Sequence, residues 1–311
     1  MTIGETMALF RTREIGSLRH ASDLVLGIGG AESNVAIALQ RLGVSTSWLG
    51  RVGADALGER VVRELRAEGL QVHDIIDPQA STGLMVKERP TSASTSVYYY
   101  RSGSAGSHLN ADDIPSGWIE DSALLHVSGI TALISESARE GISAAVDRAR
   151  AAGVLVSFDI NYRSALAPAE HAGHILRSFA ERADIVFGGP EELTLLNPDR
   201  DPAQIAGDLL RGGCREIVLK RGADGAAVFS PDSVVESPGF IIDVLDTVGA
   251  GDAFVAGYLS GMLHGLDVTD RLRRANACGA LLCMSPGDWE ASPRLVEIER
   301  FVHPSGDPVA R

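Results

Sequence analysis

The chain has 311 residues, of which 45% are hydrophobic and 22% are charged, and its formal net charge is −13 at pH 7. This composition is typical of a globular protein with one large domain or two small ones, and the negative charge argues against nucleic acid and anionic membranes as partners. An acidic substrate would therefore need a local cluster of positive residues.

The sequence contains no apolar run near the roughly 18 residues that a membrane span requires. The opening stretch MTIGETMALF has neither a basic nor an apolar signal region, so we expect no signal peptide. Three cysteines lack the spacing of metal ligands and are expected to be reduced thiols of a cytoplasmic protein: Cys214, Cys278 and Cys283.

Predicted strands and helices alternate along most of the chain. The predicted strands are Thr2–Phe10, Ser45–Val52, Leu124–Ser128, Val154–Asp159, Ile185–Gly188, Glu216–Lys220 and Ala226–Phe229. The predicted helices are Ala31–Leu42, Leu57–Glu68, Ser135–Ala151, Glu170–Ala180 and Pro202–Leu210, followed by two helices between Gly251 and Met284 that break near Gly265. This alternation predicts an α/β fold with a mostly parallel sheet covered by helices on both faces.

Residues 82–101 differ from the rest because they are rich in Thr, Ser, Val and Tyr, alternate in polarity and carry no helix signal. We predict one or two antiparallel strands there, which together with residues 11–26 form a small sheet projecting from the main body.

The first glycine-rich stretch, GIGGAESNVAIALQRLG (27–43), precedes a predicted helix. A dinucleotide-binding fingerprint fails here because Glu32 stands where the third glycine is required. Glu32, Ser33 and Asn34 place polar groups on the first helical turn, which suits recognition of hydroxyl groups. A helix start capped by Ser or Asn explains the same residues equally well.

A stretch rich in tyrosine and polar residues ends the predicted small sheet. In YYYRSGSAGS (98–107), alternation puts Tyr98 and Tyr100 on one face and Tyr99 with Arg101 on the other. Tyr99 and Arg101 together suit a carboxylate or hydroxyls, although a solvated edge strand is the alternative.

The stretch DINYRSAL (159–166) places Asp159, Asn161 and Arg163 at the end of a buried strand, which indicates a site or structural capping. The stretch IVLKRGADGAAVF (217–229) predicts a hairpin with Gly222 and Gly225 in its turn. Beside a phosphate site, such a turn would lie over a nucleotide base.

The stretch LDTVGAGDAF (245–254) places an acid between glycines and a long apolar helix. A glycine-rich turn that opens a helix makes an anion site, which should repel Asp252. No Walker A sequence exists in the chain, yet phosphoryl transfer needs only an anion site, a metal and a base that orients the acceptor. Gly249–Gly251 can supply the anion site and Asp252 the base; a simple N-cap role for Asp252 is the alternative.

These stretches together resemble the ribokinase-like (PfkB) family of sugar kinases over nearly the whole chain. DTVGAGDAF is similar to one family signature, and GIGGAESNVAIALQRLG with GRVGADALG (50–58) is similar to the other. The resemblance implies a single kinase domain over residues 1–311, an α/β core with a β-sheet lid, and the use of ATP and Mg²⁺. Within the family, GGAESN, YYYRSGSAGS and GDWEASP (287–293) are similar to kinases of 2-keto-3-deoxygluconate.

The resemblance also implies roles for individual residues. It implies Asp252 as the catalytic base, with Gly249, Ala250 and Gly251 as the anion hole. The implied substrate contacts are Gly30, Asn34, Tyr99, Arg101, Arg163 and Asp288. The implied nucleotide contacts are Asn161, Lys220, Gly222, Gly225, Gly249 and Gly251. The family's N-x-x-E motif reads GPEE (189–192) here, so Gly189 replaces Asn, and Glu192 is left to bind Mg²⁺ through water.

We therefore expect an ATP-dependent kinase that converts 2-keto-3-deoxygluconate to its 6-phosphate, because a sugar acid needs cationic partners and Arg101 and Arg163 suit its carboxylate. A kinase of a neutral ketose such as fructose is the alternative, and a sugar-sensing regulator on the same fold is a non-enzymatic one. The sequence leaves open the galactose-series epimer and activation by a monovalent cation. It also leaves the oligomeric state open, although the unpaired edges of a lid suit pairing with a second copy.

Overall fold

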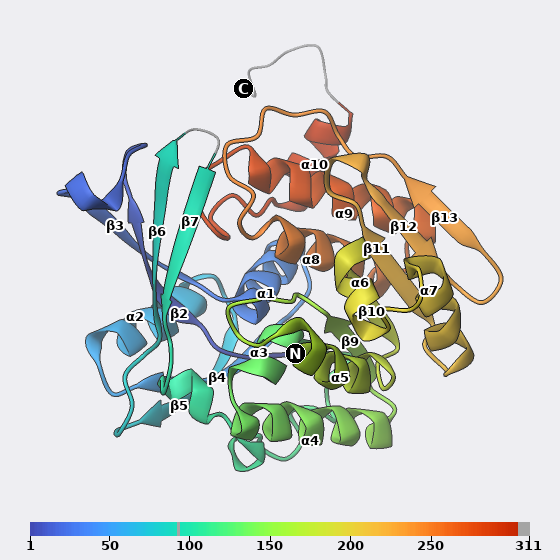
Figure 1. Ribbon diagram of the computed structural model, residues 1–311, viewed down its shortest axis with the longest axis horizontal. Helices are drawn as coiled ribbons and strands as arrows, with labels where there is room; N and C mark the ends of the chain where they lie inside the picture. The colour runs from blue at the N-terminus through green and yellow to red at the C-terminus, as the bar shows by residue number, and fades with distance from the viewer. Residues whose placement is uncertain (92–93, 304–311) are drawn as a thin grey trace.

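The computed structural model describes residues 1–91 and 94–303, which form one large sheet, a smaller second sheet and the helices around them (Figure 1). Residues 92–93 of the predicted lid and residues 304–311 of the predicted domain lie outside the described residues.

The large sheet has the strand order β13-β12-β11-β10-β9-β8-β1-β4-β5. Its strands are β1 Thr2–Ile3, β4 Ser47–Gly53, β5 Gln71–Asp77, β8 Leu124–Ser128, β9 Leu155–Asp159, β10 Ile185–Gly188, β11 Glu216–Lys220, β12 Ala226–Phe229 and β13 Val234–Ser237. Neighbouring strands from β5 to β11 run parallel, whereas β12 and β13 are antiparallel additions at one edge. Because parallel strands point the same way, the segments after β9, β10 and β11 meet at one edge of the sheet.

Helices cover both faces of this sheet, as the sequence predicts. They are α1 Ala31–Arg41, α2 Ala56–Ala67, α3 Gly129–Ile134, α4 Glu136–Ala152, α5 Ala169–Ala180, α6 Pro190–Leu196, α7 Pro202–Arg211, α8 Ala250–Leu263, α9 Val268–Cys283 and α10 Leu295–Val302. Buried residues of α4, α5, α6 and α7 form one apolar core with the sheet, and those of α1, α8, α9 and α10 form another. The predicted break near Gly265 is confirmed between α8 and α9. In the part of the chain that is described, no helix is both long and apolar enough to cross a membrane.

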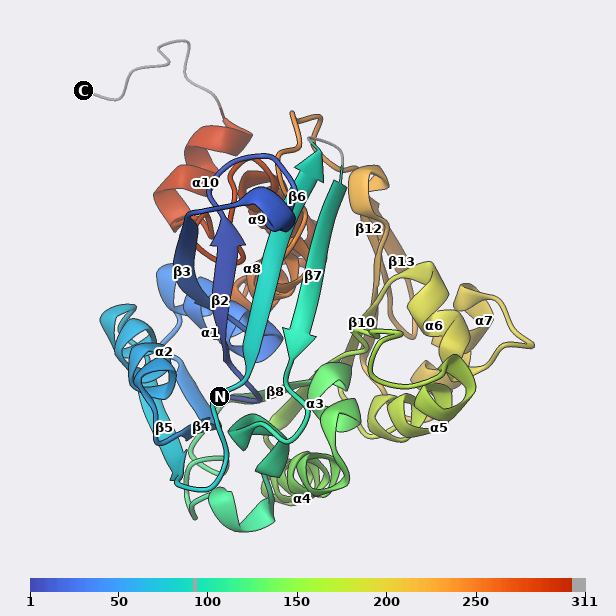
Figure 2. The ribbon, with the colours of Figure 1, turned by 60° about the vertical axis from the view of Figure 1, so that its left-hand side comes forward.

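The second sheet, which we call the lid, consists of β2 Met7–Thr12, β3 Leu24–Gly29, β6 Leu84–Thr91 and β7 Ser94–Tyr100 in the order β3-β2-β6-β7. It stands beside the large sheet as a separate ribbon (Figure 2). β2 pairs with β3 and β6 with β7 in antiparallel fashion, while β2 and β6 are parallel. The predicted small sheet and the pair of strands in residues 82–101 are thus confirmed.

Two predicted boundaries in this region are wrong. The predicted strand Thr2–Phe10 is two strands, because the chain leaves the large sheet after Ile3 and enters the lid at Met7. The crossing is tight: a Cβ on Gly4 would lie 2.3 Å from the carboxyl carbon of Glu32. Residues 11–26 are mostly the connection between β2 and β3, not the strands themselves, since β2 begins at Met7 and β3 ends at Gly29.

Candidate active site

Two cavities meet at the N-terminus of α8. The first, which we call the lid cavity, has a volume of about 670 Å³ and lies between the lid, the start of α1 and the start of α8. The second, the hairpin cavity, has a volume of about 510 Å³ and is lined by the turn between β11 and β12 and by α8 and α9. Gly249 and Asp252 line the lid cavity, whereas Ala250 and Gly251 line the hairpin cavity. The first turn of α8 therefore separates two binding spaces.

Asp252 is buried, with 8% of its surface exposed, and lies in the first turn of α8. Its Oδ2 accepts a hydrogen bond of 2.8 Å from Asn34 Nδ2, and its Oδ1 lies 3.4 Å from Asn161 Nδ2. Burial raises the pKa of Asp252 to about 7, and the negative charge of Asp159 acts in the same direction, against the Asn34 hydrogen bond. A carboxylate that exchanges a proton near neutral pH is suited to act as a general base.

The turn before Asp252 requires glycine at its first position. Gly249 has a φ of 80°. A Cβ at Gly249 would also lie 1.9 Å from the carbonyl oxygen of Asp288, so a side chain is excluded there. At Gly251 the nearest atom to an added Cβ is Lys220 Nζ, at 3.8 Å. The open backbone of the first turn and the partial positive charge of the helix N-terminus are suited to bind an anion beside Lys220.

The first turn of α1 contributes only part of what the sequence predicts. Gly30 and Asn34 line the lid cavity. At Gly30 the chain passes so close to the β1–β2 connection that a Cβ would lie 2.2 Å from the Glu5 carbonyl oxygen. Glu32 points away from the cavity, is 1% exposed and accepts hydrogen bonds of 2.6 Å from Ser128 and Thr131. The idea that Glu32 recognises hydroxyl groups is wrong, because the helix turns this residue into the protein interior.

The ends of β9 and β11 bring Asp159 and Lys220 together. Lys220 Nζ lies 2.7 and 2.9 Å from the two carboxylate oxygens of Asp159, next to the first turn of α8. Burial alone would lower the pKa of Lys220, but the carboxylates of Asp159 and Glu192 outweigh it and raise the pKa above its ordinary value. Lys220 therefore carries a permanent positive charge at the boundary between the cavities. Asn161, with a φ of 37°, lies beside Asp252 and not among the residues that line the hairpin cavity.

The turn between β11 and β12 forms one wall of the hairpin cavity, as the predicted hairpin implies. Gly222 and Gly225 both line the cavity and both have positive φ values, of 57° and 87°. A Cβ on Gly225 would lie 2.1 Å from the carbonyl oxygen of Ser237. Glycine is thus required where this turn packs against β13.

Tyr99 and Arg101 both line the lid cavity, but so do Tyr98 and Tyr100, so the cavity does not separate the two faces that alternation predicts. Tyr99 lies opposite the buried Met85 of β6, and both line the lid cavity. The guanidinium of Arg101 lies 6.0 Å from the centre of the Tyr99 ring. Arg101 is, however, held in an ion pair by the carboxylate of Glu5, which is 3% exposed. The positive charge of Arg101 is therefore already compensated within the protein.

Arg163 and Asp288 face the lid cavity from two further loops. Arg163 is exposed and, among the described residues, forms no ion pair; its guanidinium contacts only the Tyr162 carbonyl, at 3.3 Å. Asp288 is 3% exposed, and burial raises its pKa while Lys87 opposes that rise. Arg163 thus forms no close ion pair, although its positive charge opposes the rise in the pKa of Asp159 and of Asp252.

Glu192 caps helix α6. One carboxylate oxygen accepts the Tyr162 N–H at 2.9 Å, the other accepts the Gly189 N–H at 2.8 Å, and the latter lies 4.0 Å from Lys220 Nζ. Both oxygens thus have protein partners. Within residues 1–91 and 94–303, no group of three His, Cys, Asp or Glu side chains is arranged to hold a metal ion.

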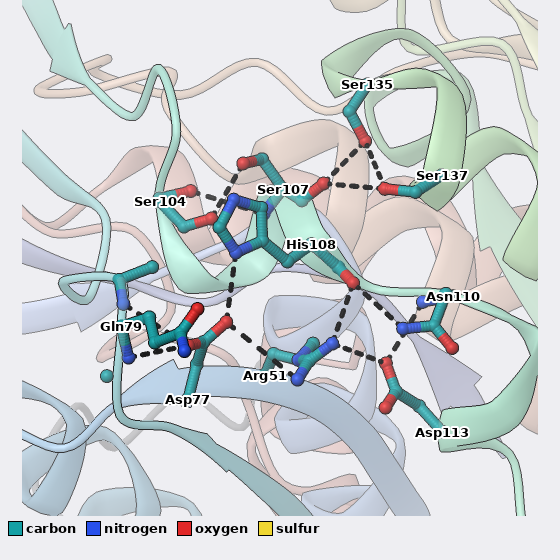
Figure 3. Close-up of polar contacts among 12 residues, drawn as sticks. Arg51, Asp77, Gln79, Ser104, Ser107, His108, Asn110, Asp113, Ser135 and Ser137 are labelled. Atoms are coloured by element: carbon teal, nitrogen blue, oxygen red, sulfur yellow. Dashed lines mark hydrogen bonds and ion pairs between the residues drawn. The ribbon is translucent and has the colours of Figure 1, made fainter.

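The segment after β7, which carries Arg101, is anchored to the core by a polar network (Figure 3). His108 Nδ1 lies 2.9 Å from Asp77 Oδ2, and Arg51 donates a hydrogen bond of 2.8 Å to the His108 carbonyl. The Ser107 carbonyl accepts hydrogen bonds from Ser135 and Ser137. The network thus ties the segment that follows Arg101 to β4, β5 and the start of α4.

Sequence reasoning missed three charged residues of this region: Glu5, Lys87 and Asp246. Glu5 follows the unexpected break between β1 and β2, and it becomes recognisable only when Arg101 is placed next to it. Lys87 lies in the lid strand β6 and contacts Asp246, the acid that opens DTVGAGD. A lone lysine in a strand gives no sequence signal of a buried ion pair.

The fold and the site are those expected of a phosphotransferase: a buried aspartate with a raised pKa lies at a helix N-terminus, between a cavity under the lid and a second cavity beside a glycine turn. Residues 1–294 match the family described as pfkB family carbohydrate kinase. The chain is 37% identical to the 2-dehydro-3-deoxygluconokinase of Bacillus subtilis (strain 168), over 97% of this chain and 94% of that protein. It is 33% identical to the 2-dehydro-3-deoxygalactonokinase of Haloferax volcanii, over 93% of this chain and 92% of that protein.

Among solved structures, a putative ribokinase II from E. coli in complex with ATP and Mg²⁺ is similar to this chain with a TM-score of 0.89 and 26% identity, covering 97% of each chain. This chain therefore belongs to the pfkB family of carbohydrate kinases, and it is a sugar kinase. The family and the fold predicted from the sequence are confirmed.

Proposed function

We propose that this protein uses ATP and Mg²⁺ to phosphorylate the 6-hydroxyl group of 2-keto-3-deoxygluconate, with Asp252 as the base. The observation that carries the proposal is the placement of Asp252, whose pKa is raised to about 7, between the lid cavity and the hairpin cavity. Two relatives named for kinases of 2-keto-3-deoxy sugar acids support the substrate class.

In this proposal the sugar lies in the lid cavity with its 6-hydroxyl at Asp252. Asp252 accepts the hydroxyl proton while the sugar oxygen forms a bond to the γ-phosphorus of ATP. The bond from that phosphorus to the bridging oxygen breaks, and ADP leaves with the electron pair. The backbone of Gly249, Ala250 and Gly251 stabilises the charge on the transferring group.

Arg163 is suited to the sugar carboxylate because it faces the lid cavity and its guanidinium forms no ion pair among the described residues. The remaining substrate contacts are made by Tyr99, Arg101, Gly30, Asn34 and Asp288. Since Glu5 fixes Arg101 in place, we assign Arg101 a hydrogen-bonding role with fixed direction in place of a free positive charge.

The nucleotide occupies the hairpin cavity, with its base over the turn that contains Gly222 and Gly225 and its phosphates toward Lys220. Asn161 orients the carboxylate of Asp252 at the phosphate end. Magnesium on the phosphates would neutralise charge on the transferring group. Glu192 is placed near Lys220 to orient the water around that ion, although both its oxygens already hold backbone N–H groups.

A panel of sugars tested for ATP consumption by coupled ADP release decides the function. The panel contains 2-keto-3-deoxygluconate, its galactose-series epimer and fructose. Preference for either acid supports the proposal and assigns the epimer. A lack of ADP release with every sugar, accompanied by sugar binding, would instead indicate a regulator.

A neutral ketose such as fructose is the second candidate, and one observation favours it. The Glu5–Arg101 pair removes one of the two positive charges that a carboxylate would use. If wild-type enzyme prefers fructose over both acids, Arg163 has another role and the acid assignment is wrong.

The lid also suits association of two copies. β3 and β7 are its edge strands, and Leu24, Tyr98 and Tyr100 on them are exposed. Unpaired edges with apolar residues are expected to be covered by a partner. We propose a homo-oligomer through the lid, which light scattering coupled to size-exclusion chromatography tests directly; a monomer at assay concentration would contradict it.

A further inference from the structure

The side chain of Lys87 is buried between two acids next to the anion site. Lys87 belongs to lid strand β6, its side chain is 3% exposed, and its Nζ lies 2.6 Å from Asp246 Oδ2 and 2.9 Å from Asp288 Oδ1. The Gly287 carbonyl lies at 3.5 Å. The Asp246 and Asp288 side chains are 1% and 5% exposed, so water does not screen the three charges.

Each of the two acids is attached to the first turn of α8. Asp246 Oδ1 accepts the Val248 N–H at 3.2 Å, one residue before Gly249. The backbone of Asp288 packs directly against Gly249, since a Cβ on Gly249 would lie 1.9 Å from the Asp288 carbonyl oxygen. The ammonium group of Lys87 therefore joins three parts of the protein: the lid, the segment that enters α8 and the loop that packs against Gly249.

The composition of the chain shows how selective this placement is. Of 28 basic residues only two are lysines, Lys87 and Lys220, and all the others are arginines. Both lysines contact buried carboxylates beside the same helix turn. An ammonium group is a compact point charge that fits between two acids, whereas a guanidinium needs a planar space. Both lysines of the chain thus stand where a compact positive charge contacts buried acids.

We propose that Lys87 is a positioning residue whose positive charge holds Asp246 and Asp288 together, and thereby sets the anion hole at Gly249–Gly251 and links it to the lid. The inference rests on the proposed kinase reaction. Lys87 itself does not line the lid cavity, so it acts through Asp246 and Asp288 and not by touching the sugar. Loss of its charge should displace the anion hole, which lowers kcat more than it changes the KM for ATP.

The test compares Lys87→Ala with Lys87→Met. Both variants lose the charge, but alanine leaves a space open while methionine fills it. A displacement on the order of 1 Å in a catalytic group costs about a hundredfold in rate, so we expect kcat to fall about ten- to a hundred-fold in both variants. Propylammonium, which corresponds to the part of the side chain that alanine lacks, should restore kcat in Lys87→Ala and not in Lys87→Met. The neutral isostere 1-propanol should restore neither.

The matched control is Arg148→Ala in α4. It removes a partly buried cation that bonds Glu120 and two carbonyls and lines neither cavity. Its kcat should match wild type and should not respond to propylammonium. Wild-type kcat in Lys87→Met, or equal rescue by propylammonium and propanol, would show that Lys87 only fills space.

If Lys87→Ala does not fold, Asp246→Asn decides the question. Asparagine keeps an acceptor for the Val248 N–H but removes the charge that Lys87 holds. A reduced kcat supports the link and an unchanged kcat refutes it. All variants are assayed with the sugar that wild type turns over fastest, so a wrong substrate assignment does not affect the outcome.

Discussion

The raised pKa of Asp252 predicts a pH dependence that an ordinary aspartate would not produce. A base must be unprotonated to accept a proton, so kcat/KM for the sugar should rise with pH and level off above the pKa of Asp252. With a pKa of about 7, the ionised fraction is about one-tenth at pH 6 and about nine-tenths at pH 8. An aspartate at its ordinary value of 3.8 would give a flat profile over that range.

The hydrogen bond from Asn34 allows the magnitude to be tested. A hydrogen bond to a charged group contributes about 1.5–3 kcal/mol, and one pKa unit corresponds to about 1.4 kcal/mol. Because Asn34 Nδ2 donates to the ionised form, Asn34→Ala should move the acidic limb of the profile upward by about one to two pH units. The KM for the sugar should rise as well, since Asn34 lines the lid cavity.

The assay is steady-state ADP release between pH 5.5 and 9 with saturating ATP and magnesium. Asp252→Asn is the control, because it keeps the shape of the side chain and removes the titrating group. We expect its kcat to be lower by about 10²–10⁴-fold, with no acidic limb near pH 7. A flat wild-type profile, or a limb that persists in Asp252→Asn, would refute the assignment of Asp252 as the base.

Three further predictions follow from the same geometry. Arg163→Ala should lower kcat/KM for 2-keto-3-deoxygluconate by at least about tenfold, and that for fructose by less, because charge-assisted hydrogen bonds contribute about 1.5–3 kcal/mol; equal losses for both sugars would show that Arg163 does not bind the carboxylate. If Glu192 orients the water around Mg²⁺, Glu192→Gln should raise the magnesium concentration needed for half-maximal activity. Gly189→Asn should lower that concentration, and a side chain fits at this position because an added Cβ meets no atom closer than 3.7 Å. An unchanged magnesium titration in both variants would exclude this role of Glu192. Finally, burial favours the protonated form of Asp252, so the contribution of this residue to stability is fully present below pH 3.8 and is lost as pH rises through about 7. Asp252→Asn should therefore raise Tm by several degrees at pH 8 and by less at pH 5. A lower Tm of this variant at pH 8 would contradict the reasoning.

The sequence was sufficient to predict the large sheet except for its two edge strands, β5 and β13, since the other strands are short apolar runs, most of them separated by amphipathic helices. β8, β10, β11 and β12 begin and end where the pattern predicts. β5 was missed because its sequence, QVHDIID, mixes charged and apolar residues as an edge strand does. The division of residues 2–10 between two sheets was missed because the polar interruption Gly4–Thr6 was included in a single strand, although it separates the apolar residues of β1 from those of β2.

The site was predictable where glycines and acids follow one another in the sequence. Gly249, Asp252, Gly222 and Gly225 stand out in glycine-rich stretches of the sequence, and all four line one of the two cavities. Pairing of charges over long separations was not predictable. Glu5 and Arg101 lie 96 positions apart, and nothing local marks either as a partner.

The lid is composed of two separate excursions from the large sheet. β2 and β3 lie between β1 and α1, and β6 and β7 lie between β5 and β8. Two ion pairs connect these excursions to each other and to the core. Glu5, at the start of the first excursion, pairs with Arg101, at the end of the second. Lys87, in the second excursion, pairs with Asp246 near α8. Grafting the lid of a relative onto this core to change its sugar preference would therefore require both excursions at once, together with the matching acids of the core. A graft of one excursion alone would leave Glu5 or Arg101 as a buried unpaired charge.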